Sequence, residues 1–278
     1  MTQPIMTLND GHKMPQLGTG IWQIADEDTP KVIEQALKTG YRLIDGAAAY
    51  KNERGMGEGI RNSGVPRDQI FVTSKLWNDS HGHDNVMRAF DETMARTGLE
   101  KLDLYLMHWP LPKLDKYVET WKAMIKLRDE GRVTSIGVAN FHEDHLRRLI
   151  DETGVAPAVN QIELHPSLPQ VELREVNKTL GIATQSWTPL GRGDSFDNPQ
   201  VKDIADRLGR SPAQVILRWH IQHGLSVIPK SEHPDRLMQN FDILTFELTP
   251  ADMKALDALG RDHRTGPNPD DFDYRKAL

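Results

Sequence analysis

The sequence predicts an α/β protein in which parallel strands alternate with helices, and three observations predict this class. Eight short apolar runs alternate with amphipathic segments, which implies parallel pairing of the strands. Three of these runs end in a polar residue, at Asp45, Lys75 and His108. The length of 278 residues suits two ordinary domains or one large barrel. Because no linker or shift in composition divides the chain, we expect a single domain over residues 1–278.

The first elements are a hairpin and one strand–helix unit. Residues 5–8 and 13–14 flank an Asn-Asp-Gly turn, which predicts a β-hairpin that caps the barrel without joining it. A strand near 18–22 and a helix over 29–38 follow, and Gly40 is typical of a helix C-cap.

The same alternation continues to residue 239. Strands are expected near 41–45, 70–75, 102–108, 133–138, 158–162, 182–187 and 225–229, and helices near 52–62, 84–97, 115–130, 143–153, 170–180, 199–208 and 234–239.

Two further helices, over 212–222 and 250–259, are expected outside the repeat. The first begins at Ser211 with proline in its first turn. Residues 261–278 lack periodicity and predict a tail over the surface.

Composition excludes several classes of protein. A formal charge of −6 argues against a nucleic-acid binder, which usually has a basic face. The sequence has no apolar run of about 18 residues and no secretory signal pattern, so we expect a cytoplasmic protein without a membrane span. The absence of cysteine excludes disulfides, thiolate metal sites and a thiol nucleophile.

The polar strand ends suggest a reaction centre. The carboxyl ends of barrel strands open onto one face, so Asp45, Lys75 and His108 should converge there, with Tyr50 just beyond the first strand. The Lys75 ammonium would make the Tyr50 phenol more acidic, and Asp45 would hold Lys75 charged. A neutral His108 could donate a hydrogen bond to a carbonyl oxygen. This set suits protonation of a carbonyl during hydride transfer from a nicotinamide cofactor.

No metal site is predicted. His81 and His83 are separated by one glycine in a polar loop and are expected to be exposed. His142 and His145 are spaced for one helix face, but they lack a set of carboxylate partners.

Seven motifs in order make the chain resemble the aldo-keto reductase family over almost its whole length. The motifs are MPQLG (14–18), YRLID (41–45, with Tyr50), TSKLW (73–77), DLYLMHWP (103–110), SIGVANF (135–141), NQIE (160–163) and IPKS (228–231). The resemblance implies a (β/α)8 TIM barrel and a catalytic tetrad of Tyr50, Lys75, Asp45 and His108.

The resemblance also implies the cofactor site. Asn140 and Gln161 correspond to residues that bind the nicotinamide carboxamide, and Trp187 to an aromatic ring that stacks on it. The loop of Leu190, Gly191, Arg192 and Gly193 would pass near the pyrophosphate. The adenosine end would be bound by four residues, and the basic ones among them favour NADPH over NADH: Lys230, Ser231, Arg236 and Asn240.

Two positions depart from the family pattern. Ala139 replaces a serine and offers no hydroxyl to the carboxamide. Gly46 replaces a threonine, which could leave Asp45 less firmly positioned.

Within the family, the prokaryotic 2,5-diketo-D-gluconate and methylglyoxal reductases are the most similar. The short chain lacks the long C-terminal loop of many relatives, which suggests an open pocket and a broad range of small-molecule carbonyl substrates. The substrate would contact Trp22, Trp77, Asn78, His108 and Trp109. We expect a monomer.

Two alternatives stay open. A nicotinamide-binding regulatory subunit without turnover would be expected to have a damaged tetrad, whereas this tetrad is intact. A metal-dependent barrel hydrolase is disfavoured, because the strand ends carry no ligand cluster.

Overall fold

A computed structural model describes residues 3–273 and 275. In these residues eight parallel strands form one sheet, and each strand pairs with its neighbour in sequence. Bridges from Leu17 to Val227 and from Gly20 to Lys230 join the first strand segment to the last, which closes the sheet into a barrel. The strands are β3 (Thr19–Gly20), β4 (Leu43–Asp45), β5 (Phe71–Leu76), β6 (Leu102–Met107), β7 (Val133–Ala139), β8 (Val159–Glu163), β9 (Ala183–Trp187) and β10 (Ser226–Val227).

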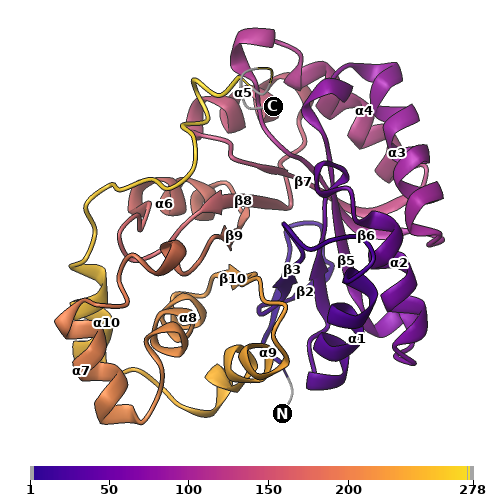
Figure 1. Cartoon of the computed structure of the whole chain (residues 1–278). Helices are drawn as coiled ribbons and strands as arrows, with labels where there is room; N and C mark the ends of the chain where they lie inside the picture. Colours follow the sequence, from indigo (N-terminus) through magenta and orange to yellow (C-terminus); the bar gives the residue numbers. More distant parts are fainter. Residues whose placement is uncertain (1–2, 274, 276–278) are drawn as a thin grey trace.

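Helices surround the strands (Figure 1). Their buried faces carry the apolar residues that pack against the outside of the barrel, and this layer is the main hydrophobic core. The helices are α1 (Thr29–Thr39), α2 (Glu53–Asn62), α3 (His83–Thr97), α4 (Tyr117–Asp129), α5 (Glu143–Thr153), α6 (Val171–Thr179), α7 (Pro199–Leu208), α8 (Pro212–Gln222), α9 (Pro234–Phe241) and α10 (Pro250–Asp257).

The helix predicted over residues 212–222 is present as α8, but it belongs to the strand–helix repeat and is not the additional helix. Helix α8 packs against β10, and its residues Val215, Ile216 and Leu217 are fully buried. Helix α7 instead packs on α8 and α10. The additional helix between β9 and β10 is therefore α7, because the longer apolar face of α8 covers the barrel.

The predicted hairpin is confirmed. Strands β1 (Ile5–Thr7) and β2 (Lys13–Pro15) pair antiparallel around Gly11, which has a positive φ of 87°. Buried Leu8 and Met14 belong to a separate apolar cluster with barrel residues such as Leu104. The hairpin therefore closes the amino-terminal end of the barrel, which leaves the opposite end for a site.

The C-terminal segment, residues 261–273, is called the strap below. It runs from α10 past α6 to α5, and is yellow in Figure 1. The expectation of a tail on the surface is incomplete, because Phe272 lies against Trp109 with ring centroids 4.2 Å apart. The strap therefore belongs to the mouth of the barrel.

Within the described part of the chain, no helix is both long enough and apolar enough to cross a membrane.

Candidate active site

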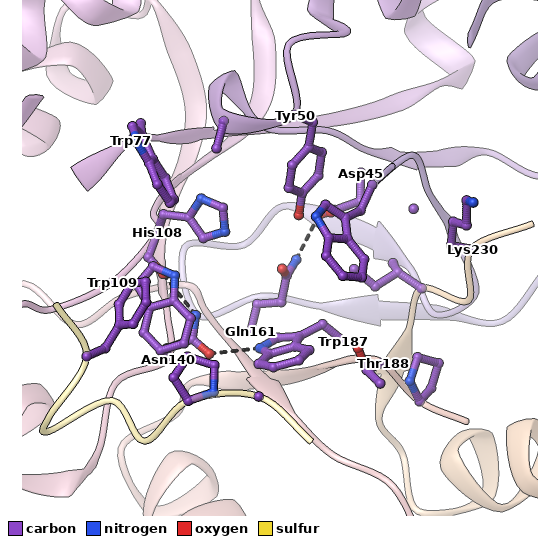
Figure 2. Close-up of a pocket in the computed structure, with 18 of the residues that line it drawn as sticks. Asp45, Tyr50, Trp77, His108, Trp109, Asn140, Gln161, Trp187, Thr188 and Lys230 are labelled. Carbon is purple, nitrogen blue, oxygen red and sulfur yellow. Dashed lines mark hydrogen bonds between the residues drawn. The ribbon is translucent and has the colours of Figure 1, made fainter. Parts of the chain in front are cut away.

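A cavity with a volume of about 440 Å³ lies at the carboxyl ends of the strands. This volume is in the range of small-molecule and cofactor sites. Its wall is formed by residues from segments that follow the strands and by the strap (Figure 2): Gly20, Trp22, Asp45, Ala49, Tyr50, Trp77, His108, Trp109, Asn140, Gln161, Trp187, Thr188, Pro189, Arg192, Ile228, Lys230, Gly266, Pro267 and Phe272.

Lys75 links two other residues of the predicted tetrad. Its Nζ atom donates to Asp45 Oδ1 at 2.5 Å, to the Gly46 carbonyl at 2.9 Å and to the Tyr50 hydroxyl oxygen at 3.3 Å. Asp45 is the last residue of β4, and Lys75 lies near the end of the adjacent β5. Tyr50 ends a short 3-10 helix (Ala48–Tyr50) directly after β4. The neighbouring strands thus bring the three side chains together.

Burial sets the protonation of this group. Burial raises the pKa of Tyr50 above 10.0, the Lys75 charge partly offsets this rise, and Asp45 adds to it. Burial disfavours the Lys75 ammonium, but Asp45 and Tyr50 outweigh that effect and raise the pKa of Lys75. Lys75 lowers the pKa of Tyr50 as expected, but the net pKa is raised, so Tyr50 is not more acidic overall. The phenol therefore stays protonated at neutral pH.

His108 completes the tetrad from the end of β6. Its ring centroid lies 6.0 Å from that of Tyr50 and 5.2 Å from that of Trp77. Burial, reinforced by the Lys75 charge, lowers the pKa of His108 well below 6.5. The ring is therefore neutral at physiological pH, which is the form that can donate one hydrogen bond.

Gln161 and Asn140 lie on the cavity wall and support their neighbours. Gln161 Nε2 donates to Asp45 Oδ2 at 2.7 Å and to Gln185 Oε1 at 2.6 Å. Asn140 Nδ2 donates to the His108 carbonyl at 2.9 Å, and its Oδ1 accepts from Trp187 Nε1 at 2.8 Å. Gln161 thus supports Asp45, and Asn140 connects His108 to the Trp187 indole (Figure 2).

Ala139 is buried at the end of β7, directly opposite Gln161 in the register of the sheet. It offers no polar side-chain atom to the cavity.

The predicted phosphate-binding residues divide into two groups. Lys230 lies on the cavity wall, and its Nζ is paired with the Glu232 carboxylate. Ser231, Arg236 and Asn240 do not line the cavity. Ser231 is buried and accepts from the His233 backbone N–H at 3.2 Å, whereas Arg236 is exposed on α9.

Leu190 and Gly191 also lie behind the wall. Leu190 packs against the main hydrophobic core and against a second apolar cluster around Trp219 of α8, and Gly191 lies against the His165 ring. Arg192, which belongs to the same loop expected near the pyrophosphate, does reach the cavity.

Three tryptophans line the cavity as predicted. Trp22 is 44% exposed at its rim, Trp77 lies against His108, and Trp109 lies against Phe272. Each of the three adds apolar ring surface to the cavity wall.

Asn78 and His81 differ from their predicted positions. Asn78 is buried and does not line the cavity, and its polar side-chain atoms have no hydrogen-bond partner in the described chain. His81, expected to be exposed, is only 3% exposed, and burial lowers its pKa to about 4. Both residues face inward because a short 3-10 helix (Asn78–Ser80) turns this loop into the protein.

Gly46 fits its surroundings without loosening Asp45. A Cβ atom at this position would lie 2.7 Å from Met56 Sδ, so Met56 fills the space that a larger residue would occupy. Asp45 is held by Lys75 and Gln161, one on each carboxylate oxygen. Its position therefore does not depend on a side chain at 46.

Sequence reasoning missed the contribution of the strap. Gly266, Pro267 and Phe272 line the cavity, although nothing in the periodicity of this segment indicated a functional position. The two prolines and the glycine around residue 266 are typical of a surface tail and predict no site. The expectation of an open pocket is therefore modified, because the strap covers part of the mouth.

Comparison with known proteins gives consistent matches. The model of the Aldo/keto reductase family matches residues 14–261. An aldo-keto reductase of Mycolicibacterium smegmatis is 52% identical over 98% of both chains. Methylglyoxal reductase DkgA of Escherichia coli K12 is 48% identical over 96% of this chain and 98% of its own. The crystal structure of a Gox0644 mutant in complex with NADPH superposes with a TM-score of 0.95, at 46% identity over 98% of this chain and 100% of that chain.

Proposed function

Since the chain belongs to the aldo/keto reductase family, we propose that it reduces small dicarbonyl compounds such as methylglyoxal to hydroxycarbonyl products. It is an oxidoreductase that uses NADPH. The observation that carries the proposal is the convergence of Asp45, Tyr50 and His108 on one cavity wall, with Lys75 directly behind Tyr50.

The residues on the wall fit a nicotinamide ring. The Nε2 hydrogens of Gln161 are used by Asp45 and Gln185, so its Oε1 is the atom that would accept from a carboxamide. The Trp187 indole is held by Asn140 and would supply a flat face for stacking. Lys230 and Arg192 would meet the phosphates.

The chain supplies the proton in this proposal, and bound NADPH supplies the hydride. Lys75 donates to the Tyr50 oxygen, which leaves the Tyr50 hydrogen for the carbonyl oxygen of the substrate. Proton transfer from Tyr50 to that oxygen completes the alcohol, and the Lys75 ammonium stabilises the phenolate that remains. A neutral His108 would orient the carbonyl by donating to the same oxygen.

Charge on the wall favours a neutral dicarbonyl over a sugar acid. In the described part of the chain, the cations on the wall are Lys230 and Arg192, and both follow the strands β9 and β10. The opposite side carries Trp77 and Trp109 (Figure 2). A carboxylate of 2,5-diketo-D-gluconate would find no cation there, whereas methylglyoxal needs none. We therefore propose 2,5-diketo-D-gluconate as the poorer substrate.

The test is loss of reduced-nicotinamide absorbance with NADPH or NADH against both compounds, for the native chain and for Tyr50→Phe. We expect NADPH to be consumed with methylglyoxal at the higher kcat/KM. We expect Tyr50→Phe to lose about 10²- to 10⁴-fold in kcat, because it lacks the proton donor, and to keep its affinity for NADPH.

Two results would contradict the proposal in different ways. Equal rates for native chain and Tyr50→Phe would remove Tyr50 as the acid. NADPH binding without turnover of either compound would favour the non-catalytic nicotinamide-binding subunit.

A further inference from the structure

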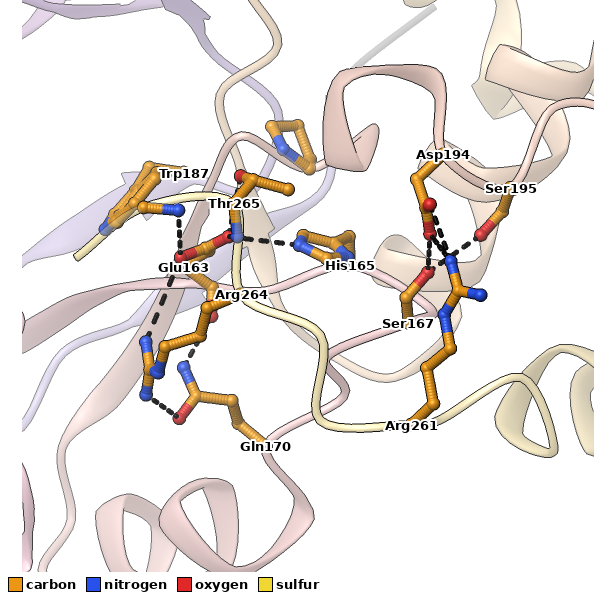
Figure 3. Close-up of polar contacts among 12 residues, drawn as sticks. Glu163, His165, Ser167, Gln170, Trp187, Asp194, Ser195, Arg261, Arg264 and Thr265 are labelled. Carbon is orange, nitrogen blue, oxygen red and sulfur yellow. Dashed lines mark hydrogen bonds and ion pairs between the residues drawn. The ribbon is translucent and has the colours of Figure 1, made fainter. Parts of the chain in front are cut away.

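A buried carboxylate holds the strap over the barrel mouth. Glu163, the last residue of β8, is fully buried. Its Oε1 accepts from the Thr265 backbone N–H at 2.6 Å and from the Thr265 hydroxyl at 2.7 Å, and its Oε2 accepts from the Gly266 N–H at 3.1 Å. His165 Nε2 lies 3.2 Å from Oε1, and Arg264 lies 3.9 Å from Oε2 (Figure 3).

The strap also makes contacts away from Glu163. The backbone N–H groups of Arg261 and His263 donate to the Ser167 carbonyl at 3.1 and 3.2 Å, and Asp270 pairs with His142 at 2.8 Å. Lys113 and Asp271 form an ion pair 3.1 Å long in which both side chains are more than 70% exposed. Arg261 binds Asp194 with its own side chain 59% exposed. Exposed ion pairs contribute little, whereas hydrogen bonds to a buried carboxylate are among the strongest in proteins. Glu163 therefore provides the fully buried, charge-assisted contacts of the strap, at residues 265–266.

Gly266, one of the anchored residues, packs against the Trp187 indole on the cavity wall. A Cβ atom at Gly266 would lie 2.5 Å from Trp187 and 3.1 Å from Glu163 Oε2, so the strap backbone touches both side chains. On its other edge, Trp187 is held by Asn140. The indole is thus fixed between Asn140 and the strap.

The same anchor fixes the apolar wall. Pro267 directly follows the anchored residues and lines the cavity, and Phe272 lines it further along, against Trp109. Release of residues 265–266 would therefore loosen Pro267 and the segment that leads to Phe272.

We propose that Glu163 is a positioning residue that holds the strap against Trp187. It thereby positions both the indole on which the nicotinamide would stack and the apolar residues of the strap that would contact the substrate. This inference rests on the proposed function for its kinetic consequences. Its structural consequence is that the strap is released when Glu163 loses its charge. This release can be measured without any enzymatic activity.

The test uses Glu163→Gln, which keeps the volume but replaces one oxygen with an NH₂ group. If that group faces Gly266, two donors oppose each other, and if it faces Thr265 two hydrogen bonds are lost. We expect the Kd of NADPH and the KM of methylglyoxal each to rise about tenfold, and kcat to change by less than about threefold, because the tetrad is untouched.

Asp252→Asn is the matched control. Asp252 is also a buried carboxylate that accepts from a backbone N–H, a threonine hydroxyl and an arginine, but it caps α10 outside the cavity. We expect this variant to lose stability without any change in Kd or KM.

Hydrogen exchange measured by mass spectrometry on the full chain without cofactor provides the readout that needs no activity. We expect the amides of residues 264–272 to exchange at least about tenfold faster in Glu163→Gln and at the native rate in Asp252→Asn. A folded Glu163→Gln chain with native exchange in the strap would overturn the proposal, even if turnover had failed in every variant.

Gly266→Ala tests the same contact if Glu163→Gln does not fold. The φ of Gly266 is not positive, so alanine fits the backbone there, and the nearest atoms to the added methyl group belong to Trp187 and Glu163. We expect the same rise in Kd and in strap exchange. Native values for both would overturn the proposal.

Discussion

The Nζ atom of Lys75 lies 3.3 Å from the hydroxyl oxygen of Tyr50, and it is fully buried. A buried ammonium is stable only with its partners in place, and Asp45 supplies the balancing charge. Asp45, Lys75 and Tyr50 thus act as one unit, in which the carboxylate secures the cation and the cation holds the phenol.

Replacement of Lys75 by methionine should therefore destabilise the protein. The variant Lys75→Met leaves Asp45 as a buried carboxylate without a cation, so we expect a loss of about 3–5 kcal/mol in the free energy of unfolding. Denaturant titration measures this change. The double variant Asp45→Asn with Lys75→Met should recover part of the stability but none of the activity. Recovery of activity would show that the ammonium is dispensable for Tyr50.

The pH dependence of kcat should be flat across the neutral range. The raised pKa of Tyr50 keeps the acid protonated as pH increases, and the lowered pKa of His108 keeps its ring neutral as pH decreases. We expect reduction at constant kcat between about pH 6 and 9, with a fall only at higher pH. An inflection near pH 6.5 that disappears in His108→Gln would mean that the ring ionises during the reaction.

Lys230 should determine the preference for NADPH. Its ammonium is paired with the Glu232 carboxylate, so the 2′-phosphate of NADPH would compete with that carboxylate for Lys230. We expect Lys230→Ala to raise the Kd of NADPH about ten- to hundredfold and to leave that of NADH unchanged. Glu232→Gln should lower the Kd of NADPH by up to about fivefold, since the pair is partly exposed. Quenching of protein fluorescence measures both values. Equal effects on the two cofactors would place the 2′-phosphate elsewhere.

Glu163 should make stability sensitive to acid. Burial alone would raise its pKa, but the hydrogen bonds from His165, Thr265 and Gly266 lower it from 4.5 to about 2. A carboxyl group with a lowered pKa stabilises the fold above its unfolded pKa, and this contribution is lost as pH falls through the folded value. We therefore expect the native protein to lose more stability than Glu163→Gln between pH 4.5 and pH 2. Thermal melting across this range measures the difference, and parallel curves would contradict the assignment.

Much of the fold was predictable because the barrel repeats a simple pattern. Apolar runs mark buried strands, and parallel strands end on one face, so Asp45, Lys75 and His108 could be brought together from their positions alone. Residues fixed by backbone register were therefore predicted well.

Residues whose position depends on packing were not predictable in the same way. The exposed position of Arg236 follows from the rotation of α9, and Asn78 faces inward because of one 3-10 turn. The strap has no periodicity, and its path is set by hydrogen bonds to Glu163 from more than 100 residues away. Such contacts between distant polar groups leave no local pattern in the sequence.

The bridge between Gly20 and Lys230 affects how the chain folds, because it joins the two ends of the barrel sequence. The contact between Thr19 and Pro229, at the same seam, spans 210 residues of sequence. Loop closure over such a separation is costly and slow, so the barrel cannot close until nearly all of the chain has been synthesised. Gly20 and Lys230 both line the cavity. A ligand that contacts both residues would therefore bind the closed barrel and not a partly folded chain. Its binding would shift the folding equilibrium toward the closed barrel.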